Sequence, residues 1–197
     1  MRKTLRRAAF LSALVIGPAT LSHAQSPAGE SAHAERIAET LIATAIEDLR
    51  ARLSPNAPRL SSDPELVRIA RERAAALAHG APFSHQDWEG HFPAKDMVQA
   101  RFGAYGFIGE NIVMEKRGTR GFDASAFAKF AAEQWMASEG HRAAILSPDY
   151  DASGIGVVVF GDQAYATQIF RGPAPPAKRA RAPRPKDATT ARFLDGF

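Results

Sequence analysis

The sequence predicts an α+β domain, because three segments with the apolar period of a helix occur together with three shorter segments that have the pattern of strands. The helical segments carry an apolar residue every three or four positions and cover residues 34–53, 63–79 and 123–138. The strand segments are short and bounded by turns, and they cover residues 109–114, 155–160 and 165–170. About 140 residues can bury one such core without disulfides. The absence of cysteine excludes a thiol nucleophile and a cysteine-ligated metal.

The first two helices are each expected to bury one apolar face. In the first helix the stripe is formed at four-residue spacing by Ile37, Leu41, Ala45, Leu49 and Leu53, and Ile42 and Ile46 widen it. Pro55 and Pro58 end this helix. The second helix begins with Asp63 as N-cap and Pro64 in the first turn, and Gly80 is the expected stop signal.

The strand segments predict one isolated strand and one hairpin. Residues 109–114 enter a strand through a glycine, and Glu110 at its start can point into a cleft while its backbone joins the sheet. Residues 155–160 and 165–170 are separated by the short turn 161–163, which predicts an antiparallel hairpin.

The third helix ends beside a candidate functional residue. Phe127 and Trp135 have the spacing of a buried face, so Trp135 is expected in the core. Gly140 is expected to break the helix and to place His141 just past the break. His141 then either joins a functional site or satisfies free carbonyl groups at the helix end.

Residues that are able to bind a metal ion or to transfer a proton occur in three separated segments, at 83–85, 109–112 and 138–142. If the fold brings His85, Glu110 and His141 together, the cluster can hold a divalent metal or move a proton. The alternatives are a surface or packing histidine at position 85 and a solvated strand-end carboxylate at position 110. His79 and His91 are expected to face solvent, with the rim of the cleft as the alternative for His91.

Five short blocks give this chain a recognisable order: Phe83-Ser84-His85, Gly109-Glu110-Asn111-Ile112, Trp135-x-x-Ser138-x-Gly140-His141-Arg142, Gly154-Ile155-Gly156-Val157 and Gln168-Ile169-Phe170. Their order and spacing resemble the CAP superfamily of cysteine-rich secretory proteins, venom antigens and pathogenesis-related proteins. The match runs from about Leu41 to Phe170 and is most similar to the bacterial, cysteine-free branch.

The resemblance implies a three-layer α-β-α sandwich with a central, mainly antiparallel sheet. It also implies a cleft with two histidines and two acids, which in some relatives binds zinc or another divalent cation. Carried to this chain, the metal ligands would be His85, His141 and Glu110, and the catalytic candidates would be Glu110 and Glu139. Relatives commonly have proline at the position of Glu139 and place their second acid nearer Ser138. Glu139 therefore either replaces that acid or faces solvent.

The two ends of the chain differ from the middle in amino-acid composition. Residues 1–24 have a basic start, an apolar run and small residues before a cleavage point, so they are expected to be a secretory signal. Residues 25–32 are expected to form a flexible lead-in, 33–171 the CAP domain, and 172–197 a disordered tail rich in proline, alanine, lysine and arginine. We therefore expect a periplasmic or secreted protein that is not transmembrane.

Charge is distributed unevenly along the chain. Residues 25–170 contain 14 basic and 19 acidic residues, although the whole chain has a formal net charge of +4. A domain with this acidic excess is not expected to bind nucleic acid. The tail carries the basic excess and can contact an anionic surface.

Two functions follow from these features. The first is a binding module whose ligand is an envelope or extracellular lipid, glycan or peptide. The alternative is a divalent-metal-dependent hydrolase, in which His85 and His141 hold the ion and Glu110 activates a water molecule. The sequence favours binding, because it shows no nucleophile with a partner base.

Overall fold

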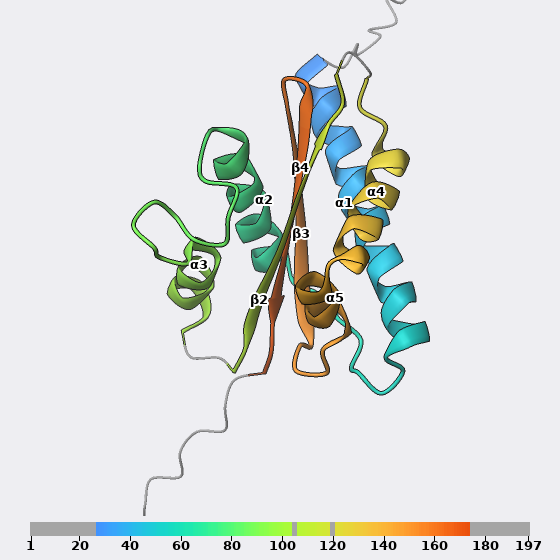
Figure 1. Ribbon diagram of the computed structural model, residues 1–197, viewed down its shortest axis with the longest axis vertical. Helices are drawn as coiled ribbons and strands as arrows, with labels where there is room; N and C mark the ends of the chain where they lie inside the picture. The colour runs from blue at the N-terminus through green and yellow to red at the C-terminus, as the bar shows by residue number, and fades with distance from the viewer. Residues whose placement is uncertain (1–26, 104–105, 119–120, 174–197) are drawn as a thin grey trace, which may run out of the picture.

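The computed structural model describes residues 27–103, 106–118 and 121–173, so the predicted signal segment 1–24 and the predicted tail from residue 174 onward lie outside the described residues. The elements, in chain order, are α1 (Pro27–Leu53), β1 (Ser61–Ser62), α2 (Pro64–Ala78), α3 (Pro93–Phe102), β2 (Ile108–Lys116), α4 (Ala124–Ala137), α5 (Glu139–Leu146), β3 (Ala152–Phe160) and β4 (Gln163–Arg171) (Figure 1). Within the described ranges, no helix is both long enough and apolar enough to cross a bilayer.

A mixed sheet forms the middle layer. The strands that the structure describes have the order β1-β3-β4-β2, in which β3, β4 and β2 are antiparallel neighbours and β1 runs parallel to β3. Helices α2 and α3 cover one face of the sheet, and α1, α4 and α5 cover the other (Figure 1). The predicted α-β-α sandwich with a mainly antiparallel sheet is confirmed. Because β2 lies at one edge, residues from both layers can meet there.

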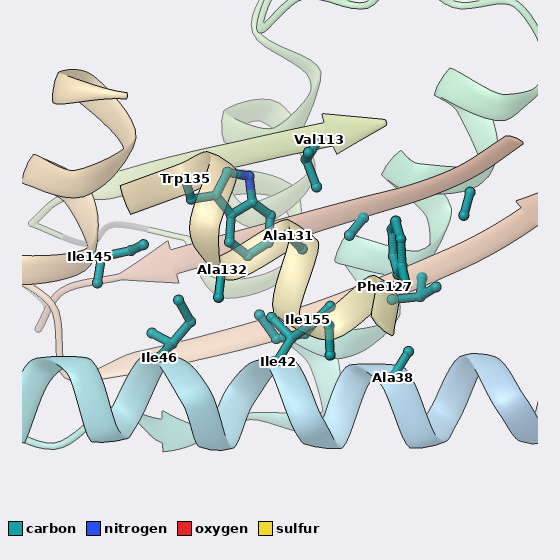
Figure 2. Packing of buried hydrophobic residues seen from close by; sticks show 14 of the residues in the cluster. Ala38, Ile42, Ile46, Val113, Phe127, Ala131, Ala132, Trp135, Ile145 and Ile155 are labelled. Carbon is teal, nitrogen blue, oxygen red and sulfur yellow. The ribbon is translucent and has the colours of Figure 1, made fainter. Parts of the chain in front are cut away.

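The larger core lies between the sheet, α1 and α4 (Figure 2). Trp135 and Phe127 of α4 are buried in it, as their spacing predicted. From α1 the core takes Ala38 together with Ile42 and Ile46, which were predicted to widen the stripe. Of the main predicted stripe, Ile37, Leu41 and Leu53 are exposed, whereas Ala45 and Leu49 are partly buried against the core. Both stripes have four-residue spacing, so the periodicity alone does not decide which one faces the sheet.

Two helices, α1 and α3, differ from the prediction. Helix α1 begins at Pro27 instead of Ala34, so residues 27–32 are helical and not a flexible lead-in. Proline in the first turn and Glu30 near the positive end of the dipole suit a helix start there. Helix α3 has no counterpart among the predicted elements. In contrast, α2 starts as predicted, with Asp63 Oδ1 accepting hydrogen bonds from the next turn.

Helix α2 packs unusually close to β3. A Cβ added at Gly154 would lie 2.2 Å from the carbonyl carbon of Leu66, and one added at Gly156 would lie 2.2 Å from the nitrogen of Arg71. Backbone of the helix therefore lies directly on the strand at both glycines. This close contact holds α2, and the loop that follows it, in place over the sheet.

Candidate functional site

The candidate site lies at the β2 edge of the sheet, where the two helical layers meet. Glu110 belongs to β2, and His85 comes from the loop between α2 and α3. His141 belongs to the first turn of α5, which covers the opposite face of the sheet. The structure thus brings together three residues that are separated by 25 and 31 positions in sequence. The sequence analysis predicted that these three residues lie close together.

Glu110 is held by two partners. Its side chain is only 7% exposed, and Oε1 accepts a hydrogen bond from Arg73 Nε at 2.9 Å. Its second oxygen, Oε2, accepts a hydrogen bond from His85 Nδ1 at 2.8 Å. Arg73, which is 2% exposed, also donates to the carbonyl of Ser84. One buried guanidinium therefore fixes both the carboxylate and the chain segment that presents His85.

The tautomer of His85 follows from this contact. Because Nδ1 carries the proton donated to Glu110, Nε2 is left with its lone pair when the ring is neutral. The ring is 45% exposed, so this nitrogen is available to a ligand or an ion. A carboxylate behind a histidine in this way orients the ring and increases its basicity as a ligand.

His141 faces His85 across the edge of β2. The two ring centroids are 5.9 Å apart and the rings are nearly perpendicular. Asn111 Nδ2 donates to the carbonyl of His141 at 3.4 Å, which ties α5 to the strand. Burial lowers the pKa of His141 below its usual value, the nearby His85 lowers it further, and Glu110 partly opposes both effects. The environment therefore favours the neutral form of this imidazole.

The helix break lies at a different residue from the one predicted. Helix α4 ends at Ala137, Ser138 is extended with φ −90° and ψ 127°, and α5 begins at Glu139. His141 is consequently inside a helix and not past the end of one. Serine is a favoured residue at helix starts, and a new helix direction from Ser138 carries Ile145 into the core.

Glu139 is the predicted site residue that lies apart from the other three. It is exposed at the start of α5. Within the described ranges, no hydrogen bond or ion pair connects it with His85, Glu110 or His141. The role proposed for it as a second acid has no geometric support.

Arg73 was missed by the sequence analysis, although the sequence contains a signal for it. It lies four residues after Ile69 and four before Leu77, both buried on the inner face of α2. A charged residue inside an apolar stripe needs a partner of opposite charge, because an unpaired buried charge is very costly. The pattern therefore indicates a buried acid facing α2, and that acid is Glu110.

A pocket of about 250 Å³ opens beside the cluster. Its walls include His85 and Glu110 together with the apolar residues Phe92, Ala94 and Ile108. His141 is not among its lining residues, so the pocket contains His85 and Glu110 of the predicted cleft, while the His141 ring lies outside it with its centroid 5.9 Å from that of His85. Helix α3, which the sequence analysis did not predict, supplies one wall. The surrounding segments expose large apolar side chains at Phe83, Trp88, Phe92 and Phe107.

A second group of possible metal ligands lies in the loop before α3. One ligand atom from each of Asp87, Glu89 and His91 falls within 4.8 Å of the others. Asp87 Oδ1 accepts from the backbone nitrogens of Glu89 and His91, so the loop itself accounts for the grouping. Glu89 and His91 are exposed, as expected for His91.

Comparisons with known proteins agree with the fold described above. The model of the CAP family, described as the cysteine-rich secretory protein family, matches residues 44–170. No curated protein matches the chain by sequence. Among solved structures, an outer surface protein from Borrelia burgdorferi has a TM-score of 0.57 at 18% identity, covering 69% of this chain and 92% of its own.

Two further structures are similar in fold. An extracellular protein with an SCP domain from Bacillus anthracis has a TM-score of 0.58 at 23% identity, and the match covers 80% of this chain but 45% of that protein. The structure of NaASP2 with Zn²⁺ has a TM-score of 0.50 at 16% identity, covering 68% of this chain and 78% of its own. At such identities the likeness shows the fold. Since the family match covers more than half of the sequence, this chain belongs to the CAP family, the cysteine-rich secretory protein family.

Proposed function

We propose that this protein is an exported ligand-binding module of the cell envelope or the extracellular space. Its ligand occupies the pocket beside His85 and Glu110. Two similar structures are those of an outer surface protein and of an extracellular protein, which supports export. The basic and apolar start of the sequence supports it independently.

The observation that favours binding over hydrolysis is the state of Glu110. A general base needs a free lone pair within hydrogen-bonding reach of the water that it activates. Each oxygen of Glu110 already accepts one hydrogen bond, from Arg73 or from His85, which leaves one lone pair on each. Because the side chain is only 7% exposed, a water molecule has little access to these remaining lone pairs. The arrangement is therefore better suited to hold His85 rigidly in the pocket wall than to move protons.

The lining of the pocket indicates the kind of ligand. Phe92, Ala94 and Ile108 offer apolar surface, while His85 offers a polar nitrogen and Lys95 is a second polar residue of the lining. Such pockets bind molecules with an apolar or ring-shaped part that is oriented by few polar contacts. A lipid, a glycan or a peptide with an aromatic or aliphatic side chain has this character.

Tryptophan fluorescence can test the pocket. The chain has two tryptophans, of which Trp88 is 79% exposed and lies four residues before Phe92, whereas Trp135 is fully buried. We expect lysophosphatidylcholine, an N-acetylglucosamine trimer or a short apolar peptide to produce a saturable blue shift of the Trp88 emission. Substituting Phe92→Ala should remove this shift, because it removes a wall of the pocket.

A matched control is available at the far end of the sheet. Phe160 is 50% exposed, close to the 46% of Phe92, but it lies in the β3–β4 hairpin. Phe160→Ala should therefore bind the same probe as the wild type. If no probe shifts the emission, or if Phe92→Ala responds like the wild type, the binding proposal is wrong.

A metal-dependent hydrolase is the second candidate, and the two histidines favour it. His85 Nε2 faces away from Glu110, and His141 is the adjacent imidazole. These donors fit zinc, and Glu110 fits the role of the carboxylate behind a ligating histidine better than that of a ligand. Zinc bound there would lower the pKa of a water molecule. With two protein ligands, binding is expected to be weak and reversible.

Calorimetry at pH 7.5, where histidines are largely neutral, tests the metal site. We expect weak Zn²⁺ uptake that His141→Ala abolishes, because neutral imidazoles are the ligands. His79→Ala is the control, since His79 contacts the Ala75 carbonyl and the Phe160 ring instead of the cluster. His91→Ala probes the separate group in the loop. Uptake that survives His141→Ala but disappears in His91→Ala would assign the zinc to that loop and contradict this site.

A further inference from the structure

Four large aromatic side chains are exposed in the segments that form or border the His85 pocket. They are Phe83, Trp88, Phe92 and Phe107, and their exposed fractions range from 46% to 79%. In the described part of the chain, one other phenylalanine, tyrosine or tryptophan is exposed, Phe160 in the distant β3–β4 hairpin. Soluble domains rarely expose large apolar patches, and such patches mark interaction sites. We call these four residues the aromatic surface.

The described part of the chain ends beside the aromatic surface. The nitrogen of Gly106 donates to the carbonyl of Pro173 at 2.9 Å, and the nitrogen of Gly172 donates to the carbonyl of Phe107 at 2.9 Å. Pro173 is the last described residue, and Ile108, which lines the pocket, is two positions after Gly106. The segment that follows Pro173 therefore starts next to Phe107 and the pocket.

Residues 174–186, which we call the basic segment, are rich in proline and in positive charge. They contain five basic residues, four prolines and no acidic residue. A proline-rich chain extends by about 3.1 Å per residue, so a segment of this length can span about 40 Å. A domain of about 140 residues has a radius of gyration of roughly 14 Å. The basic segment is therefore long enough to reach every part of the aromatic surface.

The loop that carries Trp88 and Phe92 has the opposite charge. Residues 85–96 contain the acids Asp87, Glu89 and Asp96 and the single base Lys95. Glu89 and Asp96 are exposed, and within the described ranges neither of them takes part in an ion pair. These carboxylates attract a basic chain and repel an anionic lipid surface. The charge of the loop therefore favours the basic segment over a membrane as the occupant of the aromatic surface.

The chemistry of the surface also suits a chain of this composition. Proline-rich segments dock on aromatic side chains with little loss of entropy, because they are already extended. A guanidinium group binds carboxylates and stacks on aromatic rings, as Arg171 does on Phe102 with 4.6 Å to the ring centroid. The basic segment offers both prolines and arginines. Aromatic rings next to carboxylates are the matching partners for both.

We propose that the basic segment docks on the aromatic surface of its own domain and covers the His85 pocket. Its prolines lie against Trp88 and Phe107, and its arginines pair with Asp87 and Glu89. Because the segment is joined to the domain beside the pocket, its effective concentration there is high. A ligand of the pocket then has to displace the segment. This competition rests on the function proposed for the pocket, whereas the docking itself does not.

A spin label tests the docking in the full mature chain. The chain has no cysteine, so Ala182→Cys allows a single nitroxide to be attached in the basic segment. In the ¹⁵N-labelled chain, we expect the nitroxide to broaden the backbone amide signals of residues 86–92 and of Phe107. The signal of Gly161, in the distant hairpin, should stay sharp.

A mixing experiment identifies which molecule the segment occupies. Spin-labelled chain without ¹⁵N is mixed with ¹⁵N-labelled chain that has no nitroxide, and we expect no selective broadening. Equal broadening in this mixture would show that the segment docks on a second copy, which would overturn the inference. Absence of broadening in the singly labelled chain would overturn it as well. Co-sedimentation with phosphatidylglycerol vesicles in that case would assign the surface to a membrane.

Charge variants separate docking at this loop from general attraction to an acidic domain. Asp87→Asn combined with Glu89→Gln should reduce the broadening at least about twofold, because exposed ion pairs contribute little individually but act here together. The matched control is Asp48→Asn combined with Glu133→Gln, which removes two exposed acids from α1 and α4 and should broaden like the wild type. Broadening that is spread evenly over the domain would contradict the proposal.

The aromatic contribution has its own pair of variants. Trp88→Ala should also reduce the broadening at least about twofold, whereas Phe160→Ala, which removes an exposed ring far from the loop, should not. Broadening that is unchanged both in Trp88→Ala and in the neutralised loop would contradict the docking. These samples contain no ligand for the pocket, so a negative result would leave the proposed binding function intact.

Discussion

Replacing Arg73 by methionine is expected to lower the free energy of unfolding by about 3 kcal/mol, which is the usual effect of removing one partner from a buried ion pair. Arg73 and Glu110 have side chains that are 2% and 7% exposed, and the substitution would leave the carboxylate buried with His85 as its remaining partner. The segment before His85 would also lose its anchor at the Ser84 carbonyl. Urea denaturation measures the change.

The same helix provides the control. Arg68 pairs with Glu65 and Glu72, but these side chains are between 35% and 50% exposed. Arg68→Met should therefore cost less than about 1 kcal/mol, as exposed ion pairs do. Adding Glu110→Gln to Arg73→Met should restore part of the stability, because it removes the unpaired charge. Equal losses for Arg68→Met and Arg73→Met would contradict the buried-pair interpretation.

Placing alanine at Gly156 is expected to destabilise the protein by about 3 kcal/mol, at the upper end of the usual cost of overpacking. The new Cβ would lie 2.2 Å from the nitrogen of Arg71 and 2.3 Å from the carbonyl carbon of Ala70. These are backbone atoms of a helix, so they cannot move aside as the end of a side chain can. Helix α2 must shift as a whole, and the shift would also move Arg73. Thermal and urea denaturation both report the loss.

Gly140→Ala is the matched substitution at a glycine without close neighbours. A Cβ at Gly140 meets nothing within 4 Å, and the residue lies in α5. Alanine favours a helix by up to about 1 kcal/mol over glycine, so this variant should be as stable as the wild type or slightly more stable. If Gly140→Ala and Gly156→Ala lose the same stability, close packing of α2 on β3 is not the reason.

Local signals were sufficient for most elements. The N-cap Asp63, the turn at 161–163 and the apolar spacing of 123–138 depend on neighbouring residues, and the structure confirms each of them. Helix α3 has a weak apolar pattern, with Ala94 and Val98 as its buried residues, so periodicity did not reveal it. Strand β1 has two residues and forms only because β3 is beside it.

For the candidate site too, the sequence predicted one part of the arrangement and only the structure showed the other. The sequence identified His85, Glu110 and His141 as members of one cluster, and the structure brings them together at the edge of β2. The sequence analysis did not identify how Glu110 is used. That depends on Arg73, which reaches the carboxylate from another element, 37 positions away in sequence.

The sequence by itself determined the fold class, because cap residues, turn residues and apolar spacing act over a few positions and each segment carries its own signal. The tertiary structure decided which stripe of α1 is buried, since Ile37 and Ala38 begin stripes of equal period and only the shape of the sheet distinguishes them. The tertiary structure also explains why positions 154 and 156 are glycines, because the atoms that exclude a side chain there belong to α2. Contacts between distant segments depend on the positions of complete elements, and no local pattern encodes those positions.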